Sequence, residues 1–331
     1  MARMHSFFIS LLVLFLFGST GLSLAQKKVV ISHSVRGGLS IGPLLYGIER
    51  GFYRAEGIDL LYVSIRADLG IKAMLAGEVD YIYSAGTALR AAVRGVPVKA
   101  LSFDFYKVFH SLMARPEIKS AGDLKGKKVA VGSFGATGDL AARVSLRAIG
   151  LDPVKDVTIL ALGADAIRYA ALQSGVVQAA NMPLPWNVRM KREGYRELFY
   201  AGKIFHQPLT GLTTTAEKIE KNPDQVRRTL RAFARSSRAL KEEKKEFLAF
   251  VEKKFSLAPD VAEEAYGYLI DALSQDGIVE DALLQTMLDD ERKMAGMSKP
   301  VGASEVVDYR FLREALAGLT RLPWRGQEGR R

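Results

Sequence analysis

Residues 73–80 of the chain read AMLAGEVD, and residues 170–178 read AALQSGVVQ. In each stretch a helical segment stops at a glycine and a strand-like segment follows. The two stretches suggest two lobes built from a similar α/β unit. Because helix–glycine–strand punctuation is common in α/β proteins, the fold class depends on the segments around them.

The pattern around the first stretch alternates between strands and helices. Predicted strands are residues 27–33 (KKVVISH), 57–65 (GIDLLYVSI), 79–84 and 98–105, and predicted helices are 41–52, 68–76 and 86–94. Alternation of this kind indicates a parallel sheet covered by helices. The same order restarts downstream, with strands at 129–131, 157–162 and 177–182 and helices at 139–149 and 164–173.

The C-terminal third is predicted to be helical. Asn222 and Pro223 form a good helix start, since Asn caps free N–H groups and Pro fits the first turn. Helices are expected at 227–241, 245–255, 260–273, 280–295 and 304–316. The expected fold class is therefore α/β with a helical C-terminal extension.

Composition excludes several kinds of chemistry. The 331 residues are 48% hydrophobic and 25% charged, which suits two globular domains and excludes intrinsic disorder. The absence of Cys excludes disulfides, thiol nucleophiles and Cys-based metal sites. The glycine spacing at 132, 135 and 138 departs from the dinucleotide fingerprint in its first gap. We expect no catalytic residue, no metal site and no cofactor.

Residues 1–25 have the three-part organisation of a signal peptide. Arg3 supplies a positive charge, residues 7–17 (FFISLLVLFLF) are apolar, and Ser23 and Ala25 precede a predicted cleavage before Gln26. A membrane anchor would need ~20 apolar residues, more than this run contains. Cleavage removes one positive charge from a net +11, so the exported, periplasmic protein carries +10. In that compartment the charge favours anionic small molecules or membrane surfaces over nucleic acid.

Four loops at predicted strand ends carry hydroxyl and small residues. Their candidate ligand-binding residues are Ser34 and Arg36; Ser84, Ala85 and Thr87; Ser133, Phe134, Gly135, Ala136 and Thr137; and Asn181. Ligands of open α/β sheets bind beyond the carboxyl ends of strands, where helix N-termini offer N–H groups to anions. Arg36 would add a charge-assisted contact. Because such residues also make ordinary turns, the prediction depends on the four loops occurring together. The aromatic residues Phe105 and Tyr106 also lie near strand ends and are candidates to flank a ligand.

Several motifs occur in a specific order: LYGIERGFY at 45–53, EGID at 56–59, AGEVD at 76–80, GVPV at 95–98 and SAGDLKGKKVAV at 120–131. In this order the chain resembles periplasmic substrate-binding proteins of ABC importers, in the branch that handles nitrate, sulfonates, taurine and thiamine precursors. The resemblance covers nearly the whole chain after residue 25. One departure is Gln178, where the pattern usually has Asp.

The resemblance implies a two-lobe, type II periplasmic binding protein fold. Lobe one would contain residues 27–113 plus 209–331 and lobe two residues 114–208, with crossings near 112–116 and 205–210. The ligand would lie between the lobes, and hinge closure would bury it. By position, the residues facing it would be Ser34, Arg36, Ser84, Thr87, Phe105, Ser133, Thr137 and Asn181.

The implied function is capture of a small anion, such as a sulfonate, nitrate or a carboxylate, by a monomeric binding protein. The partners would be a membrane permease and a separate ATPase. Two alternatives are a binder of thiamine precursors or aromatic ligands, and an enzyme of the same fold that uses His33 as its base. Enzyme activity is not expected, because the pyrimidine-forming relatives carry a cysteine-rich motif and this chain has no Cys. A ligand-sensing role is not separable from transport by sequence.

Overall fold

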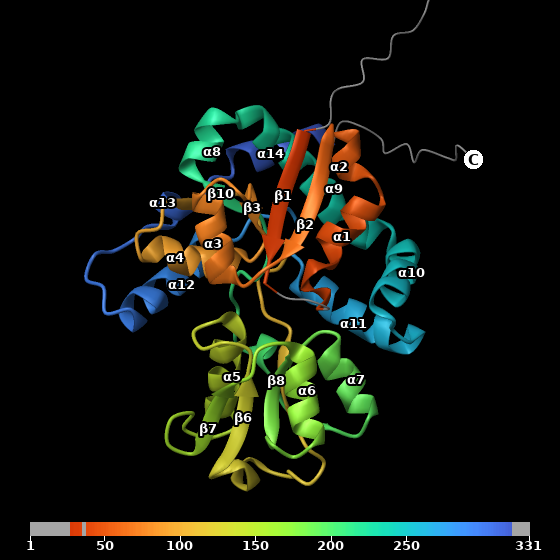
Figure 1. Cartoon of the computed structure of the whole chain (residues 1–331), viewed down its shortest axis with the longest axis vertical. Coiled ribbons are helices and arrows are strands. Elements are labelled where there is room, and N and C mark those ends of the chain that lie inside the picture. Colours follow the sequence, from red (N-terminus) through yellow and green to blue (C-terminus); the bar gives the residue numbers. More distant parts are fainter. Residues whose placement is uncertain (1–26, 35–37, 320–331) are drawn as a thin grey trace, which may run out of the picture.

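The computed structural model describes residues 27–34 and 38–319, which form two lobes, each around a five-stranded sheet (Figure 1). The first sheet has the order β2-β1-β3-β10-β4 and the second the order β7-β6-β8-β5-β9. The strands of the first sheet are β1 Lys27–His33, β2 Ile58–Ser64, β3 Tyr81–Ile82, β4 Val98–Ala100 and β10 Thr213–Thr215. The strands of the second sheet are β5 His110–Ala114, β6 Lys127–Val131, β7 Val157–Ala161, β8 Ala179–Pro183 and β9 Arg196–Tyr200.

The two sheets share one pairing pattern. In the first, β1 pairs in parallel with β2 and β3, and β10 is antiparallel to β3 and β4. In the second, β6 pairs in parallel with β7 and β8, and β5 is antiparallel to β8 and β9. Each antiparallel strand is the first strand after the chain has crossed from the other lobe. The suggested similarity of the two lobes is therefore confirmed at the level of topology.

The helices flank both sheets. They are α1 Gly42–Glu49, α2 Phe52–Ala55, α3 Ala67–Leu75, α4 Ala85–Val93, α5 Thr137–Ala148, α6 Asp165–Gln173, α7 Trp186–Arg192, α8 Ala216–Lys221, α9 Pro223–Glu242, α10 Lys244–Phe255, α11 Pro259–Ala272, α12 Asp281–Met294, α13 Ala303–Val306 and α14 Arg310–Leu319, with short 3-10 helices at Leu39–Ile41, Ala121–Leu124 and Ala201–Lys203. The glycines that end α3 and α6, Gly77 and Gly175, have φ of 77° and 78°, a conformation that glycine adopts without strain.

The C-terminal helices cover mainly the first lobe (Figure 1). Helix α9 packs along α1, α2 and α14, and α12 packs on α4. Helix α11 instead reaches the second lobe, where Lys191 and Arg192 of α7 form ion pairs with Glu264. The predicted helical extension is therefore confirmed, and one of its members also holds the second lobe.

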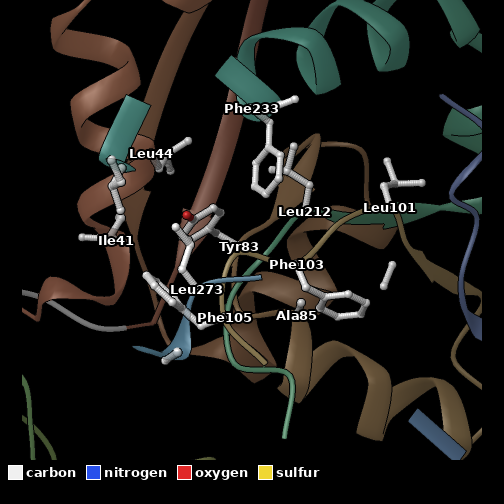
Figure 2. Close-up of a cluster of buried hydrophobic side chains, with 14 of the residues drawn as sticks. Ile41, Leu44, Tyr83, Ala85, Leu101, Phe103, Phe105, Leu212, Phe233 and Leu273 are labelled. Atoms are coloured by element: carbon white, nitrogen blue, oxygen red, sulfur yellow. The ribbon is translucent and has the colours of Figure 1, made fainter. Parts of the chain in front are cut away.

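The core of the first lobe is rich in aromatic side chains. Figure 2 shows Tyr83, Phe103, Phe105 and Phe233 close to small and aliphatic neighbours such as Ala85. These five side chains are at most 1% exposed. Burial of one large apolar side chain stabilises a fold by about 1.5–3 kcal/mol, so this cluster anchors both β3 and the segment that leaves the lobe.

Two chain segments connect the lobes. The first runs from β4 to β5 and the second from the 3-10 helix Ala201–Lys203 to β10. They pair through their backbones, with Leu101 N–H donating to Leu212 O at 2.7 Å and Leu209 N–H donating to Phe105 O at 2.9 Å. Residues 110–114 form β5 and pair with β8 of the second sheet. We propose lobe limits of 27–109 plus 204–319 and 110–203.

The predicted signal peptide and cleavage point, and Arg36, lie outside the described residues. Within residues 27–34 and 38–319, no helix has the length and apolar character needed to span a bilayer.

Candidate functional site

The first two predicted loops meet at Ser84. Strands β1 and β3 are parallel neighbours, so their carboxyl ends lie side by side. The Oγ atoms of Ser34 and Ser84 are 3.1 Å apart, and Ser34 N–H also donates to Ser84 Oγ at 3.3 Å. Ser84 Oγ lies 2.9 Å from His33 Nδ1, and His33 Nε2 lies 3.2 Å from Ser40 Oγ. The loops after β1 and β3 therefore form one hydrogen-bonded unit.

His33 is held as a neutral imidazole. Its ring is 3% exposed and packs edge-on against Tyr83 at 5.6 Å. Burial lowers its pKa to about 3. A neutral imidazole has one donor and one acceptor nitrogen, which matches a serine hydroxyl on each side.

Arg90 joins the second loop to the third and thereby crosses between the lobes. Its Nη2 donates to Thr87 Oγ1 at 3.1 Å, one turn earlier on α4, and to Thr137 Oγ1 at 2.9 Å. Thr137 is the first residue of α5 in the second lobe. The guanidinium therefore sits where the starts of α4 and α5 approach each other.

The charge of Arg90 is buried and incompletely paired. The residue is 6% exposed, and its Nη1 has no hydrogen-bond partner among the described residues. Burial lowers its pKa to about 10, partly offset by Glu291, so the group is charged at neutral pH. Glu291 itself pairs with Arg94 at 2.6 Å. A buried cation with an unused donor is unfavourable unless an anion joins it.

The third and fourth loops meet at Gly138. A Cβ at this second residue of α5 would lie 3.1 Å from Asn181 Oδ1 and 3.8 Å from His110 Nε2, so both side chains approach the helix backbone closely. Asn181 is 1% exposed. In the described part of the chain, Asn181 Nδ2 and the buried His110 Nδ1 lack hydrogen-bond partners. Burial lowers the pKa of His110 to about 3, helped by the charge of Arg168.

A backbone contact completes the ring of loops. Leu39 N–H, just after the first loop, donates to Leu184 O, just after the fourth, at 3.0 Å. Each predicted loop therefore contacts the next. Among the described residues, three buried polar atoms of this cluster have no hydrogen-bond partner: Arg90 Nη1, Asn181 Nδ2 and His110 Nδ1.

Arg168 positions the fourth loop. Its Nε donates to Asn181 O at 3.0 Å and its Nη2 to Asp165 Oδ1 at 2.5 Å. Both side chains are buried, and burial raises the pKa of Asp165. The guanidinium is therefore a structural support that orients Asn181.

Most of the third loop is exposed to solvent and makes no hydrogen bond to this cluster among the described residues. Ser133, Phe134 and Gly135 are exposed, and Phe134 is 61% exposed. Gly135 N–H donates to Asp139 Oδ2 at 2.9 Å, so this donor is already used within the loop. Ala136 is half-buried and precedes α5. Only Thr137, of the predicted residues in this loop, joins the cluster.

Three other predicted residues lie apart from the cluster. Ala85 and Phe105 are fully buried, and Phe105 packs edge-on against Phe109 with ring centroids 5.0 Å apart. The Tyr106 hydroxyl donates to Asp271 O at 3.1 Å, at the end of α11. In this conformation neither Ala85, the first residue of α4, nor Phe105, in the first crossing segment, has surface to offer a ligand, because both are buried in the core.

Two residues of the cluster were not predicted from sequence. Arg90 lies three residues after Thr87, and this spacing places both on one face of a helix. That spacing was the available signal. His110 follows no motif and became part of the cluster only through the pairing of β5 with β8.

Residues 39–246 match the family model described as "NMT1/THI5 like". The chain belongs to the NMT1/THI5-like family. Solved structures share its fold at low sequence identity. They include a protein from Bordetella bronchiseptica RB50, with TM-score 0.75, 20% identity and coverage of 89% of this chain and 98% of that one.

Two further neighbours have names that state a ligand. The alkanesulfonate-binding protein SsuA from Xanthomonas axonopodis pv. citri, bound to MOPS, has TM-score 0.70 and 17% identity and covers 85% of this chain and 98% of that one. The periplasmic nitrate-binding protein NrtA from Synechocystis PCC 6803 has TM-score 0.70 and 17% identity and covers 91% and 92%. No curated protein sequence matches significantly. The predicted resemblance and the type II binding-protein fold are confirmed.

Proposed function

We propose that this NMT1/THI5-like protein is the extracytoplasmic solute-binding component of an ABC importer. It captures a small organic or inorganic anion, such as a sulfonate, nitrate or a carboxylate, at the junction of its two lobes and delivers it to a membrane permease. Support comes from the family, from the fold shared with binding proteins for sulfonate and nitrate, and from the chemistry of the junction.

The incompletely paired guanidinium of Arg90 carries this proposal. An anion beside Nη1 would satisfy the buried charge and lie close to the start of α5, where helix N–H groups favour negative charge. Asn181 Nδ2 is a further donor. Each hydrogen bond to a charged group contributes ~1.5–3 kcal/mol. Three such contacts sum to about 4.5–9 kcal/mol before ordering costs, so micromolar affinity, about −8 kcal/mol, also needs apolar contact with the ligand.

Ligand binding and lobe closure would act together in this arrangement. Arg90 contacts Thr87 of one lobe and Thr137 of the other, so an anion on Arg90 favours the conformation in which both contacts exist. The ion pairs between α7 and α11 hold the lobes together at a second place. The closed form would be the one that docks on the permease.

The alternatives have weaker support. A general base works best when its pKa lies near the operating pH, and burial gives His33 a pKa of about 3 with serine hydroxyls at both ring nitrogens. For an aromatic ligand, Phe105 and Tyr106 offer no platform beside Arg90, because one is buried in the core and the other is turned to α11.

Calorimetry with alkanesulfonates, nitrate, carboxylates and thiamine precursors tests the proposal. We expect anions to bind and Arg90→Gln to weaken binding by about tenfold or more. Arg90→Lys keeps the charge and should lose less. Arg147→Gln is the matched control, because Arg147 is exposed on the same helix as Thr137 but at its other end. A preference for neutral or cationic compounds, or an unchanged affinity in Arg90→Gln with circular dichroism like the wild type, contradicts the proposal.

Two further proposals concern residues outside the described ranges. If Arg36 pairs with the ligand, Arg36→Ala should cost ~1–3 kcal/mol of binding free energy, and unchanged affinity removes Arg36 from the site. If residues 1–25 are a signal peptide, N-terminal sequencing of the exported protein should begin at Gln26. An uncut N-terminus would contradict the cleavage.

A further inference from the structure

A polar cavity lies at the end of the first sheet opposite the lobe junction. Its volume is about 220 Å³, and it is found where β1, β2 and α9 begin. Its polar lining consists of Lys27, Lys221, Asn222, Asp224, Gln225 and Arg228. Lys27 and His33 are at opposite ends of β1, ~20 Å apart at about 3.3 Å per residue. The cavity is therefore separate from the junction of the lobes. Figure 1 shows the start of β1, which contributes Lys27 to the cavity, at the top of the molecule.

Gln225 is the unusual residue of this cavity. It is 4% exposed, and neither its Nε2 nor its Oε1 has a hydrogen-bond partner in the ranges that the structure describes. Buried side-chain amides are normally bonded at both atoms. A group that both accepts and donates a hydrogen bond would therefore be favoured in the cavity.

The start of α9 adds a second preference. Asn222 precedes this 20-residue helix but makes no side-chain cap hydrogen bond. Its Oδ1 instead accepts from Lys27 Nζ at 3.2 Å. The first-turn N–H groups consequently lack a side-chain cap, and such groups attract anions.

The charges of the lining favour an anion as well. The lining contains three basic side chains, Lys27, Lys221 and Arg228, and one carboxylate, Asp224. The Asp224 carboxylate is paired with Arg228 Nε at 2.9 Å. An adjacent cavity of about 180 Å³ shares Lys221 and Asn222. Its two carboxylates are already ion-paired, with Lys218 and Lys221. Arg228 is therefore paired with Asp224 and Lys221 with Glu217, and Lys27 is the basic side chain of this lining that has no carboxylate partner among the described residues, so the cavity that contains Gln225 has one excess positive charge.

We propose that this cavity is a binding site for a protonated oxyanion, hydrogen phosphate. Its unprotonated oxygens accept from Gln225 Nε2, from the first turn of α9 and from Lys27, and its O–H donates to Gln225 Oε1. Sulfate has no such proton at neutral pH, so Gln225 Oε1 would stay unbonded with it. The site is independent of the function proposed for the lobe junction.

Titration with inorganic phosphate and with sulfate, followed by calorimetry, tests this site. We expect saturable phosphate binding that is tighter than sulfate binding. Gln225→Leu should weaken phosphate binding by about tenfold and abolish the preference. Gln225→Glu keeps the shape of the side chain but adds a negative charge, and it should also lose binding. Arg147→Gln, on the exposed surface of the second lobe, should bind like the wild type.

The outcomes separate this site from the junction. Phosphate binding that survives in Arg90→Gln and fails in both folded Gln225 variants supports the inference. Binding that fails in Arg90→Gln but survives in the Gln225 variants places the anion at the junction and overturns it. The absence of saturable binding, or equal affinity for phosphate and sulfate, also overturns it.

Discussion

Replacing Asp104 by asparagine should change how the stability of the protein depends on pH. Asp104 is fully buried in the first crossing segment, and the hydroxyls of Tyr83 and Ser237 donate to its two carboxylate oxygens. Burial raises its pKa from 3.8 to about 7, although these two hydrogen bonds act in the opposite direction. The folded protein therefore holds a proton on Asp104 at pH values where the unfolded chain has released it.

The magnitude follows from the difference in pKa. Each pKa unit corresponds to about 1.4 kcal/mol, so a rise from 3.8 to about 7 corresponds to about 4 kcal/mol. This stability is present below about pH 4 and is lost as pH rises through about 7. Asp104→Asn cannot ionise, but its amide N–H₂ faces a hydroxyl that now donates, which costs about 1 kcal/mol. We expect the variant to be slightly less stable than wild type near pH 4 and about 3 kcal/mol more stable near pH 8.

Urea unfolding of both proteins across this pH range measures the difference. His33 and His110 also titrate abnormally, but both proteins contain them, so their contributions cancel in the comparison. Asp59→Asn is the matched control, because Asp59 is exposed on β2 and exposed substitutions usually change stability by less than about 0.5 kcal/mol. A difference between Asp104→Asn and wild type that is constant from about pH 4 to about pH 8 would refute the reasoning.

Three other perturbations have defined outcomes. Gly86→Ala should destabilise the fold by ~1–3 kcal/mol in thermal unfolding, because a Cβ there would lie 2.3 Å from Pro208 O. Gly267→Ala in α11 is the control and should be neutral or stabilising, because a Cβ there would meet no described atom within 4 Å outside its own helix backbone. Equal effects of the two substitutions would contradict the prediction. Below about pH 6.5 the unfolded chain binds a proton on His33 that the folded protein does not bind until about pH 3, so wild type loses about 1.4 kcal/mol of stability per pH unit in this range. His33→Gln should remove this loss, and identical slopes of unfolding free energy against pH in urea unfolding would contradict the prediction. Glu264→Gln removes partly exposed ion pairs with α7 and should lower ligand affinity by no more than about fivefold in calorimetry, so a much larger loss would assign α11 a greater role.

The parallel strands were predictable because their signals are local. The predicted strand 27–33 coincides with β1, and the glycines that stop α3 and α6 were recognisable from the sequence. The antiparallel strands β5 and β10, and the edge strand β9 that pairs with β5, were not predicted. Thr213–Thr215, for example, has no alternation of polar and apolar residues, and its strand conformation depends on partners far away in the chain.

Tertiary contacts also changed predicted element boundaries. The predicted strand 98–105 ends at Ala100, because the residues after it form the crossing segment. The predicted helix 304–316 is divided into α13 and α14. At the break, Val307 bridges to Ala100 and Asp308 N–H donates to Ala100 O at 2.8 Å, so pairing with the sheet replaces the helical hydrogen bonds.

In the candidate site, too, some features were predictable from the sequence, whereas others depend on tertiary contacts. Loops that follow strands at one edge of a sheet are recognisable in the sequence, and Ser34, Ser84, Thr87, Thr137 and Asn181 do come together. That Arg90 is buried with an unused donor depends on the second lobe, because Thr137 reaches Arg90 only after the chain has crossed between the lobes. Local propensity depends on neighbouring residues, whereas burial of a charge depends on what the rest of the chain places around it.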